Sequence, residues 1–127
     1  MIYGIGTDIV RVARMQKNLD QHGEKFAHRI LTEHEQVDFR KTVKPAHFLA
    51  KRFAAKEATA KAMGTGFTDG LSLRDIGVGH DALGKPVLEF QGKAALFMAE
   101  QAITEAHISL ADEEDHAVAF VTLVKMA

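Results

Sequence analysis

Apolar and polar residues alternate at the start of the chain, which predicts a strand over Ile2–Val10. One face of this strand would carry its larger side chains, Tyr3, Ile5, Thr7 and Ile9. The opposite face would carry Gly4, Gly6 and Asp8. Because glycine has no side chain, the two glycines leave room around Asp8, so we expect another group to approach the backbone there.

Helical periodicity follows in the next part of the chain. The segments with this period are Val12–His22, Glu24–Leu31 and a long one over about Ala46–Met63. Thr32 and Glu35 have the spacing of a capping box, in which each side chain bonds a free backbone amide where a helix begins. Gly64 is placed to end the long helix, because glycine readily takes the left-handed conformation of a C-terminal cap.

The second half of the chain changes mainly to strand periodicity. The segments expected in order are a strand over Arg74–His80, a turn over 81–86, a strand over Val87–Phe90, a helix over Lys93–Ala106, and strands over His107–Leu110 and His116–Lys125. Leu96, Ala99 and Ile103 would share one face of that helix. This order predicts an α+β fold, in which an antiparallel sheet packs with one long helix and shorter helices, as a single domain over residues 1–127.

Composition excludes several classes of protein. Hydrophobic residues make up 46% of the 127 residues, enough for a core. The absence of cysteine excludes disulfides, thiolate metal sites and cysteine nucleophiles. The chain has no apolar run of membrane-spanning length, and its first residues lack the charged leader and apolar segment of a signal peptide. We therefore expect a cytoplasmic protein with no membrane segment and no nucleic-acid partner.

Charge is unevenly distributed between the two halves of the chain. Residues 1–61 contain 12 Lys and Arg against 7 Asp and Glu, whereas residues 62–127 contain 4 against 10. A basic surface on the first half would suit an acidic partner or a polyanionic ligand. An ordinary uneven distribution, solvated on all sides, accounts equally well for the numbers.

The long predicted helix carries charges among small residues. On a helical wheel Lys56 falls on the apolar side with Leu49 and Phe53, and Glu57 and Lys61 lie at its edge, one turn apart. In a structural interpretation, Glu57 and Lys61 form an ordinary ion pair on the helix. The methylene groups of Lys56 would then cover apolar surface while its ammonium group reaches water. The alternative is that these charges face a polar ligand, because charges in such a stripe need partners.

Asp8 favours the ligand interpretation. Asp8 and Glu57 together offer hard oxygen ligands, and Mg²⁺ is often held by one or two carboxylates with substrate phosphates completing its shell. The basic residues expected to neutralise the other phosphate oxygens are Arg52, Lys56 and Lys61. The seven histidines show no zinc-ligand spacing. The pattern suits a substrate that contains a pyrophosphate.

These residues also lie in motifs that resemble a known family. The motifs, in chain order, are Gly4–Asp8, Phe53–Lys61, Gly64–Gly66, Leu83–Pro86 and His107–Leu110. As an ordered set across nearly the whole chain they resemble the 4'-phosphopantetheinyl transferases, and most closely the small type that assembles from identical subunits. Each motif is modestly specific by itself, and the ordered set is strongly specific.

The resemblance implies an activity and a site. Members of this family move the 4'-phosphopantetheine arm of coenzyme A onto a serine of acyl carrier protein in fatty acid biosynthesis, and release 3',5'-ADP. Asp8 and Glu57 would hold Mg²⁺ and Lys61 would bind phosphate, so these three are the expected catalytic residues. The other residues expected to bind coenzyme A are Gly64, Thr65, Gly84, Lys85, Pro86 and His107. The small members are homotrimers with active sites between subunits, so the last four residues could come from a neighbouring chain.

The resemblance also gives the basic half of the chain a partner. Acyl carrier proteins are acidic, so a docking strip would contain Arg11, Arg14, Lys17, Lys25 and Arg29. Met15 and Phe26 would be its apolar anchors, unless both belong to the core. Lys85 and His107 likewise have structural alternatives, as a turn residue and as a histidine bonded to backbone where a strand begins.

One departure and two alternative functions remain open in the sequence. Many relatives carry a histidine just after the last motif, where this chain has Ala111 and Asp112. If that histidine acts as a base in the relatives, its role is vacant here or passes to Asp112, a residue more typical of a turn. The preferred proton acceptor is Glu57, acting directly or through a metal-bound water. A Mg²⁺-dependent hydrolase of a nucleotide pyrophosphate would use the same metal chemistry with water as nucleophile. A third possibility is a binding module that only sequesters coenzyme A or a carrier protein and catalyses neither transfer nor hydrolysis.

Overall fold

The computed structural model describes residues 1–126 and confirms an α+β fold with antiparallel pairing. Its first half contains, in order, β1 (Ile2–Arg11), α1 (Val12–His22), α2 (Glu24–Ile30), α3 (Glu33–Lys41) and α4 (Pro45–Met63). Its second half contains a short 3₁₀ helix, η1 (Leu73–Asp75), then β2 (Ile76–His80), β3 (Pro86–Phe90), α5 (Gly92–Glu100), β4 (Ile103–Asp112) and β5 (His116–Lys125).

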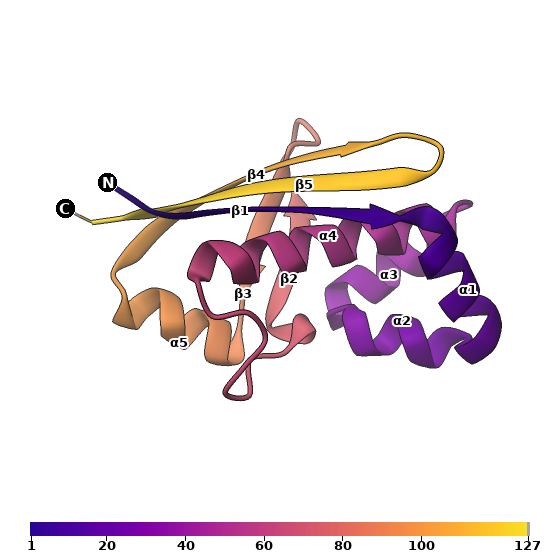
Figure 1. The fold of residues 1–127 in the computed structure, drawn as a ribbon, viewed down its shortest axis with the longest axis horizontal. Coiled ribbons are helices and arrows are strands. Elements are labelled where there is room, and N and C mark those ends of the chain that lie inside the picture. Colours follow the sequence, from indigo (N-terminus) through magenta and orange to yellow (C-terminus); the bar gives the residue numbers. More distant parts are fainter. Residues whose placement is uncertain (127) are drawn as a thin grey trace.

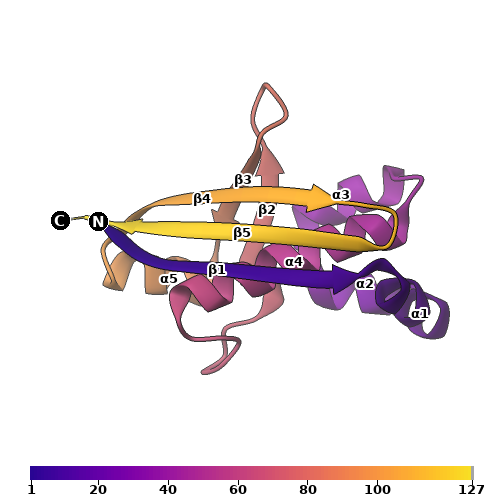
Figure 2. The ribbon, with the colours of Figure 1, turned by 45° about the horizontal axis from the view of Figure 1, so that its top comes forward.

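Two antiparallel sheets surround the long helix. The larger sheet has the strand order β1-β5-β4, and β2 and β3 form a separate hairpin. Helix α4 runs along one face of the larger sheet, with α1 to α3 gathered near one end of the molecule and α5 near the other (Figure 1). The hairpin extends beyond the β4 side of the larger sheet, opposite to the edge strand β1 (Figure 2). The edge of β1 is therefore the open side of the sheet beside α4.

The glycines of β1 bring its backbone into contact with α4. A Cβ atom built on Gly4 would lie 2.0 Å from the carbonyl oxygen of Ala62, and one on Gly6 would lie 2.0 Å from that of Ala58. Any larger residue at either position would push the helix away from the strand. The close approach expected around Asp8 is thus confirmed, and the group that approaches is the backbone of α4.

The predicted helix ends are confirmed at two places. Thr32 and Glu35 form the capping box of α3, with each side chain accepting a hydrogen bond from the backbone amide of the other. Gly64 ends α4 in the left-handed conformation with φ of 81°. Thr32 thus marks where α3 begins, and Gly64 marks where α4 ends.

The predicted end of the fifth helix was wrong. Helix α5 stops at Glu100 instead of Ala106, and Ala102 turns the chain with φ of 56°. Ile103 then begins β4 and is buried, whereas Leu96, expected on the buried face of the helix, is 58% exposed. The β-branched pair Ile103 and Thr104 favours a strand, and pairing with β5 decides the outcome because it hydrogen-bonds the whole segment.

Candidate active site

Asp8 lies where β1 meets α4. It is on the same face of the strand as Gly4 and Gly6, and its side chain is 17% exposed. The Nζ atom of Lys61 donates to Asp8 Oδ1 and to the carbonyl oxygen of Thr7, each at 3.0 Å. The structure thus joins Asp8 to a residue 53 positions away in the chain.

Glu57 lies one turn before Lys61 on α4 and is half-buried. Its pKa is raised above the usual value, first by burial and then by the negative charge of Asp8, while the positive charges of Lys61 and Arg14 act in the opposite direction. Asp8 and Glu57 are therefore close enough to repel each other. Arg14, from α1, is a member of this cluster that the site prediction missed, since it was assigned only to carrier docking.

The donor set of this cluster suits a hard divalent cation. Two carboxylates that repel each other in a partly buried site are relieved by a cation between them. Among residues 1–126, no three His, Asp or Glu side chains gather into a metal-binding group. A site with two protein carboxylates leaves other ligand positions to water and substrate phosphate, which is the usual arrangement for Mg²⁺. Asp8 and Glu57 fit such an ion, with Lys61 beside it.

The prediction that Lys56 binds phosphate was wrong. The side chain of Lys56 is completely buried, and its Nζ atom donates to Glu35 Oε1 at 2.6 Å, to the carbonyl oxygen of Leu73 at 3.1 Å and to that of Ile76 at 2.7 Å. All three of its donors therefore have partners inside the protein. Burial lowers its pKa, and the neighbouring Glu35 charge opposes that effect.

Arg52 is likewise an interior residue, contrary to the prediction that it neutralises phosphate beside Lys61. It is 4% exposed, its guanidinium lies 4.3 Å from the centroid of the Phe48 ring, and its Nε atom is 3.4 Å from Glu35 Oε2. A helical wheel cannot reveal the partner of these two cations, because Glu35 belongs to another helix. The only sequence signal for Glu35 was its place in the capping box.

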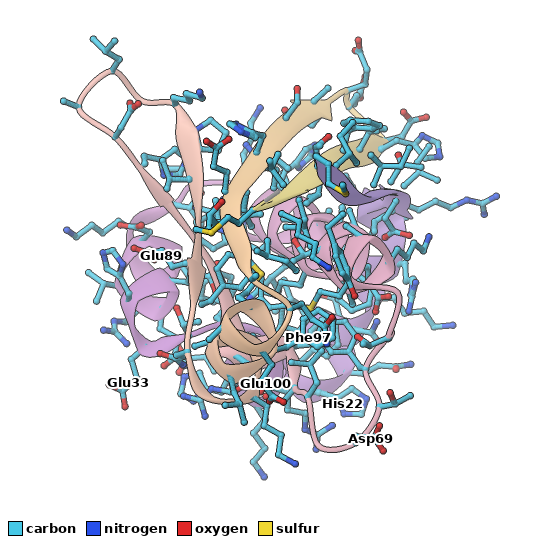
Figure 3. The ribbon with its side chains drawn as sticks, turned by 90° about the vertical axis from the view of Figure 1, so that its left-hand side faces the viewer. His22, Glu33, Asp69, Glu89, Phe97 and Glu100 are labelled. Carbon is cyan, nitrogen blue, oxygen red and sulfur yellow. The ribbon has the colours of Figure 1, made fainter. Side chains whose placement is uncertain are left out.

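The other predicted ligands of coenzyme A fall into two groups. Gly64 and Thr65 directly follow α4, and Thr65 lines a cavity of about 330 Å³ that Leu71 and Phe97 also line. Asp69, Phe97 and Glu100 mark this cavity in Figure 3. The cavity therefore begins just beyond the end of the helix that carries Glu57 and Lys61.

The second group lies away from this cluster within one chain. Gly84, with φ of 85°, and Lys85 lie in the turn of the β2–β3 hairpin, and Pro86 begins β3 on the far side of the sheet from β1 (Figure 2). His107 is on β4 opposite Thr122, on the outer face of the sheet, and its Nε2 atom is 3.1 Å from Glu105 Oε2. Within a single chain, therefore, these residues do not lie beside Asp8.

The predicted docking residues also separate. Arg14 and Arg29 are exposed on α1 and α2, and Phe26 is half-buried against the core. Met15 is 1% exposed, so the prediction that it anchors a carrier protein was wrong. It faces inward because α1 packs that side against α4, which makes Met15 a core residue.

A larger cavity of about 650 Å³ lies elsewhere, between α3 and the β2–β3 hairpin. Its lining includes Glu33, His34, Arg74 and Glu89, and two of these, Glu33 and Glu89, are labelled in Figure 3. It contains none of the predicted site residues. We therefore place the candidate active site at Asp8, Glu57 and Lys61, and not in this cavity.

Comparison with known proteins identifies the family. A family model described as the 4'-phosphopantetheinyl transferase superfamily matches residues 4–121. The chain belongs to this superfamily. The resemblance stated from the sequence motifs is confirmed, and so is the fold class expected from it.

This transferase has similar relatives along its full length. It is 55% identical over 124 residues to a protein named holo-[acyl-carrier-protein] synthase from Halorhodospira halophila, with 98% of each chain covered. A crystal structure of holo-[acyl-carrier-protein] synthase from Neisseria meningitidis has 50% identity and a TM-score of 0.93, covering 98% of this chain and 100% of that one. The Bacillus anthracis synthase, solved in complex with CoA (3',5'-ADP), has 38% identity and a TM-score of 0.83, with 99% of each chain covered.

No helix within residues 1–126 of this transferase has both the length and the apolar character needed to cross a membrane.

The raised pKa of Glu57 predicts a pH-dependent stability. Because folding raises this pKa, the folded state binds the proton more tightly, so stability falls as pH rises above the usual carboxyl range. Without divalent ions, Glu57→Gln should raise the melting temperature by roughly 1–4 °C at pH 7 and by nothing at pH 4, measured by calorimetry. Glu113→Gln, in the exposed β4–β5 turn, is the control and should shift neither value. A lower melting temperature for Glu57→Gln at pH 7 would contradict the proposed repulsion.

Proposed function

We propose that this transferase moves the 4'-phosphopantetheine group of coenzyme A to a serine of apo acyl carrier protein, giving holo acyl carrier protein and 3',5'-ADP. The observation that carries the proposal is the convergence of Asp8, Glu57 and Lys61 in a chain whose relatives are named holo-[acyl-carrier-protein] synthase. The serine oxygen bonds to the β-phosphorus, the bond from that phosphorus to the 3',5'-ADP oxygen breaks, and the serine proton passes to a base. Its place in fatty acid biosynthesis and in the cytoplasm remains a prediction from the family.

The residues of the cluster have separate roles in this reaction. Asp8 and Glu57 would hold Mg²⁺, which when bound supplies positive charge at the pyrophosphate. Lys61 neutralises a further phosphate oxygen and is already oriented by Asp8 and by the Thr7 carbonyl. Reaction then depends mainly on positioning and charge stabilisation. The apolar residues Leu71 and Phe97 of the cavity at Thr65 suit the uncharged pantetheine arm.

Glu57 is the better supported of the two candidate proton acceptors. It belongs to the Asp8 and Lys61 cluster, where it would accept the serine proton directly or through a metal-bound water. Asp112 lies at the end of β4, 4.0 Å from Lys51 near the opposite end of α4. That position supports a structural role for Asp112, as its turn-like sequence context suggested.

The outer face of the larger sheet supports assembly with identical chains. Ile5, Ile9 and Phe120 on this face are 59%, 65% and 47% exposed. An exposed apolar face on paired strands is typical of a subunit interface. His107 belongs to the same face, so a neighbouring chain seated there is also brought close to it. A homotrimer in which His107 and the Gly84–Pro86 turn complete a neighbour's site accounts for both features.

Transfer to a carrier is tested by the mass of the protein product. Incubation with coenzyme A, Mg²⁺ and apo acyl carrier protein should add one phosphopantetheine to the carrier, and a chelator should abolish the gain. Asp8→Ala and Glu57→Ala should each lower kcat at least about 100-fold while the fold is kept. Nucleotide release without carrier would instead support the hydrolase, and binding without either product would support the sequestering module. Undiminished activity in both variants would remove these residues from the site.

The docking strip predicts a salt-sensitive defect. Arg29→Glu reverses a charge that is exposed on α2, so it should raise the KM for the carrier roughly 10-fold at low salt and leave kcat unchanged. Arg14→Glu should raise KM similarly and also lower kcat, because the Arg14 charge acts on Glu57. Steady-state kinetics at two salt concentrations measure both effects. Normal carrier KM in both variants would show that the strip is placed wrongly.

The proposed trimer predicts that one charge on the outer face separates the subunits. Phe120→Arg should convert the assembly to monomers in analytical ultracentrifugation, because burying an unpaired guanidinium is unfavourable. Transfer activity should fall with it, since the site would lose its neighbour's residues. Val43→Arg, in the exposed loop between α3 and α4, is the matched control for an added surface charge and should stay assembled. A wild-type monomer with full activity would end the trimer proposal.

A further inference from the structure

A buried charge cluster joins α3 to α4, and the proposed reaction makes no direct use of it. Glu35 is 1% exposed and Lys56 is fully buried. Burying two charges is costly unless both are paired and fully hydrogen-bonded, and an apolar pair of similar size is often as stable. The presence of this pair in the core therefore calls for a function besides packing.

The pair is bonded in several fixed directions. Glu35 Oε1 accepts from Lys56 Nζ at 2.6 Å and from the Thr32 amide at 2.9 Å, and Glu35 Oε2 accepts from the Val78 amide at 3.0 Å. Lys56 also donates to the Leu73 and Ile76 carbonyl oxygens. These bonds connect α4 to α3, to η1 and to β2.

Lys56 and Glu57 are neighbours on α4, so their side chains leave the helix about 100° apart. Lys56 points to Glu35 in the interior, and Glu57 points to the side of the helix where Asp8 lies. On the β1 side, the helix backbone rests against Gly4 and Gly6. The helix is thus held by contact with a strand on one side and by directed charged bonds on another.

We propose that the Glu35–Lys56 pair sets the rotation of α4 and thereby positions Glu57 beside Asp8. The directed bonds of Lys56 would break if α4 turned or slid, whereas apolar contacts of similar area tolerate such shifts. Glu35 and Lys56 are positioning residues, because neither touches the proposed substrate or metal. This inference rests on the proposed function of the Asp8 and Glu57 site.

The test replaces both charges with side chains of similar size, Glu35→Gln together with Lys56→Met. Because Arg52 Nε lies 3.4 Å from Glu35 Oε2, the same change is also made with Arg52→Met, so that no buried cation is left without its counter-charge, and both variants should behave alike. Circular dichroism and melting establish that the variant is folded. Mn²⁺ is then titrated in the presence of coenzyme A, with free Mn²⁺ followed by electron paramagnetic resonance. We expect the Kd for Mn²⁺ to rise about 10-fold and kcat to fall by a similar factor, which is about 1.4 kcal/mol. The KM for the carrier should stay unchanged.

A matched control separates positioning from stability. Ile103→Ala removes a buried side chain at the start of β4, away from the charge pair, and should lower the melting temperature while leaving Mn²⁺ affinity unchanged. If the double variant does not fold, the positioning role is tested with Glu35→Asp. This change keeps the negative charge but shortens the side chain by one carbon, so we expect weaker Mn²⁺ binding.

Unchanged Mn²⁺ affinity in a folded charge-pair variant would overturn the positioning role and leave the proposed function intact. Absence of Mn²⁺ binding in the wild-type protein would overturn the metal site itself, and the inference with it. A weakening in Ile103→Ala equal to that in the charge-pair variant would also overturn positioning, because instability alone would then explain it.

Discussion

The contact between the backbones of β1 and α4 is the constraint on which the rest of the structure depends. Gly4 and Gly6 leave no space for a side chain, because the carbonyl oxygens of Ala62 and Ala58 already occupy it. With strand and helix this close, Asp8 is brought within hydrogen-bonding distance of Lys61. A bulkier strand would separate the carboxylate from the helix, and with it the two halves of the candidate metal site.

Helix α4 divides its charges between two environments. Lys56 and Arg52 point into the core around Glu35, and Glu57 and Lys61 lie at the edge of β1. The alanines between them allow neighbours to pack on nearly every side of the helix, so each charge meets a different part of the protein. The same helix therefore stabilises the core and supplies the groups proposed for catalysis.

The separation of predicted ligands within one chain agrees with a site shared between subunits. The Asp8 side of the sheet faces α4, whereas His107 belongs to the outer face with exposed apolar residues, and the hairpin that carries Lys85 extends past the β4 edge (Figure 2). Assembly through that outer face would cover the apolar surface and bring residues from different chains together. Each active site would then contain residues from more than one chain.

The sequence by itself determined the elements and the motifs, because strand alternation, helical period, the Thr32 capping box and the Gly64 cap are local patterns. It also indicated Asp8, Glu57 and Lys61, since few chemistries need carboxylates and a lysine among glycine and alanine. Only the tertiary structure decided that Lys56 and Arg52 pair with Glu35 and that Met15 is buried in the core. It also decided that Ile103 begins a strand instead of continuing the preceding helix. In each of these cases the partner is distant in the chain. The free energy of burial and pairing depends on that partner, and a local pattern contains no information about it.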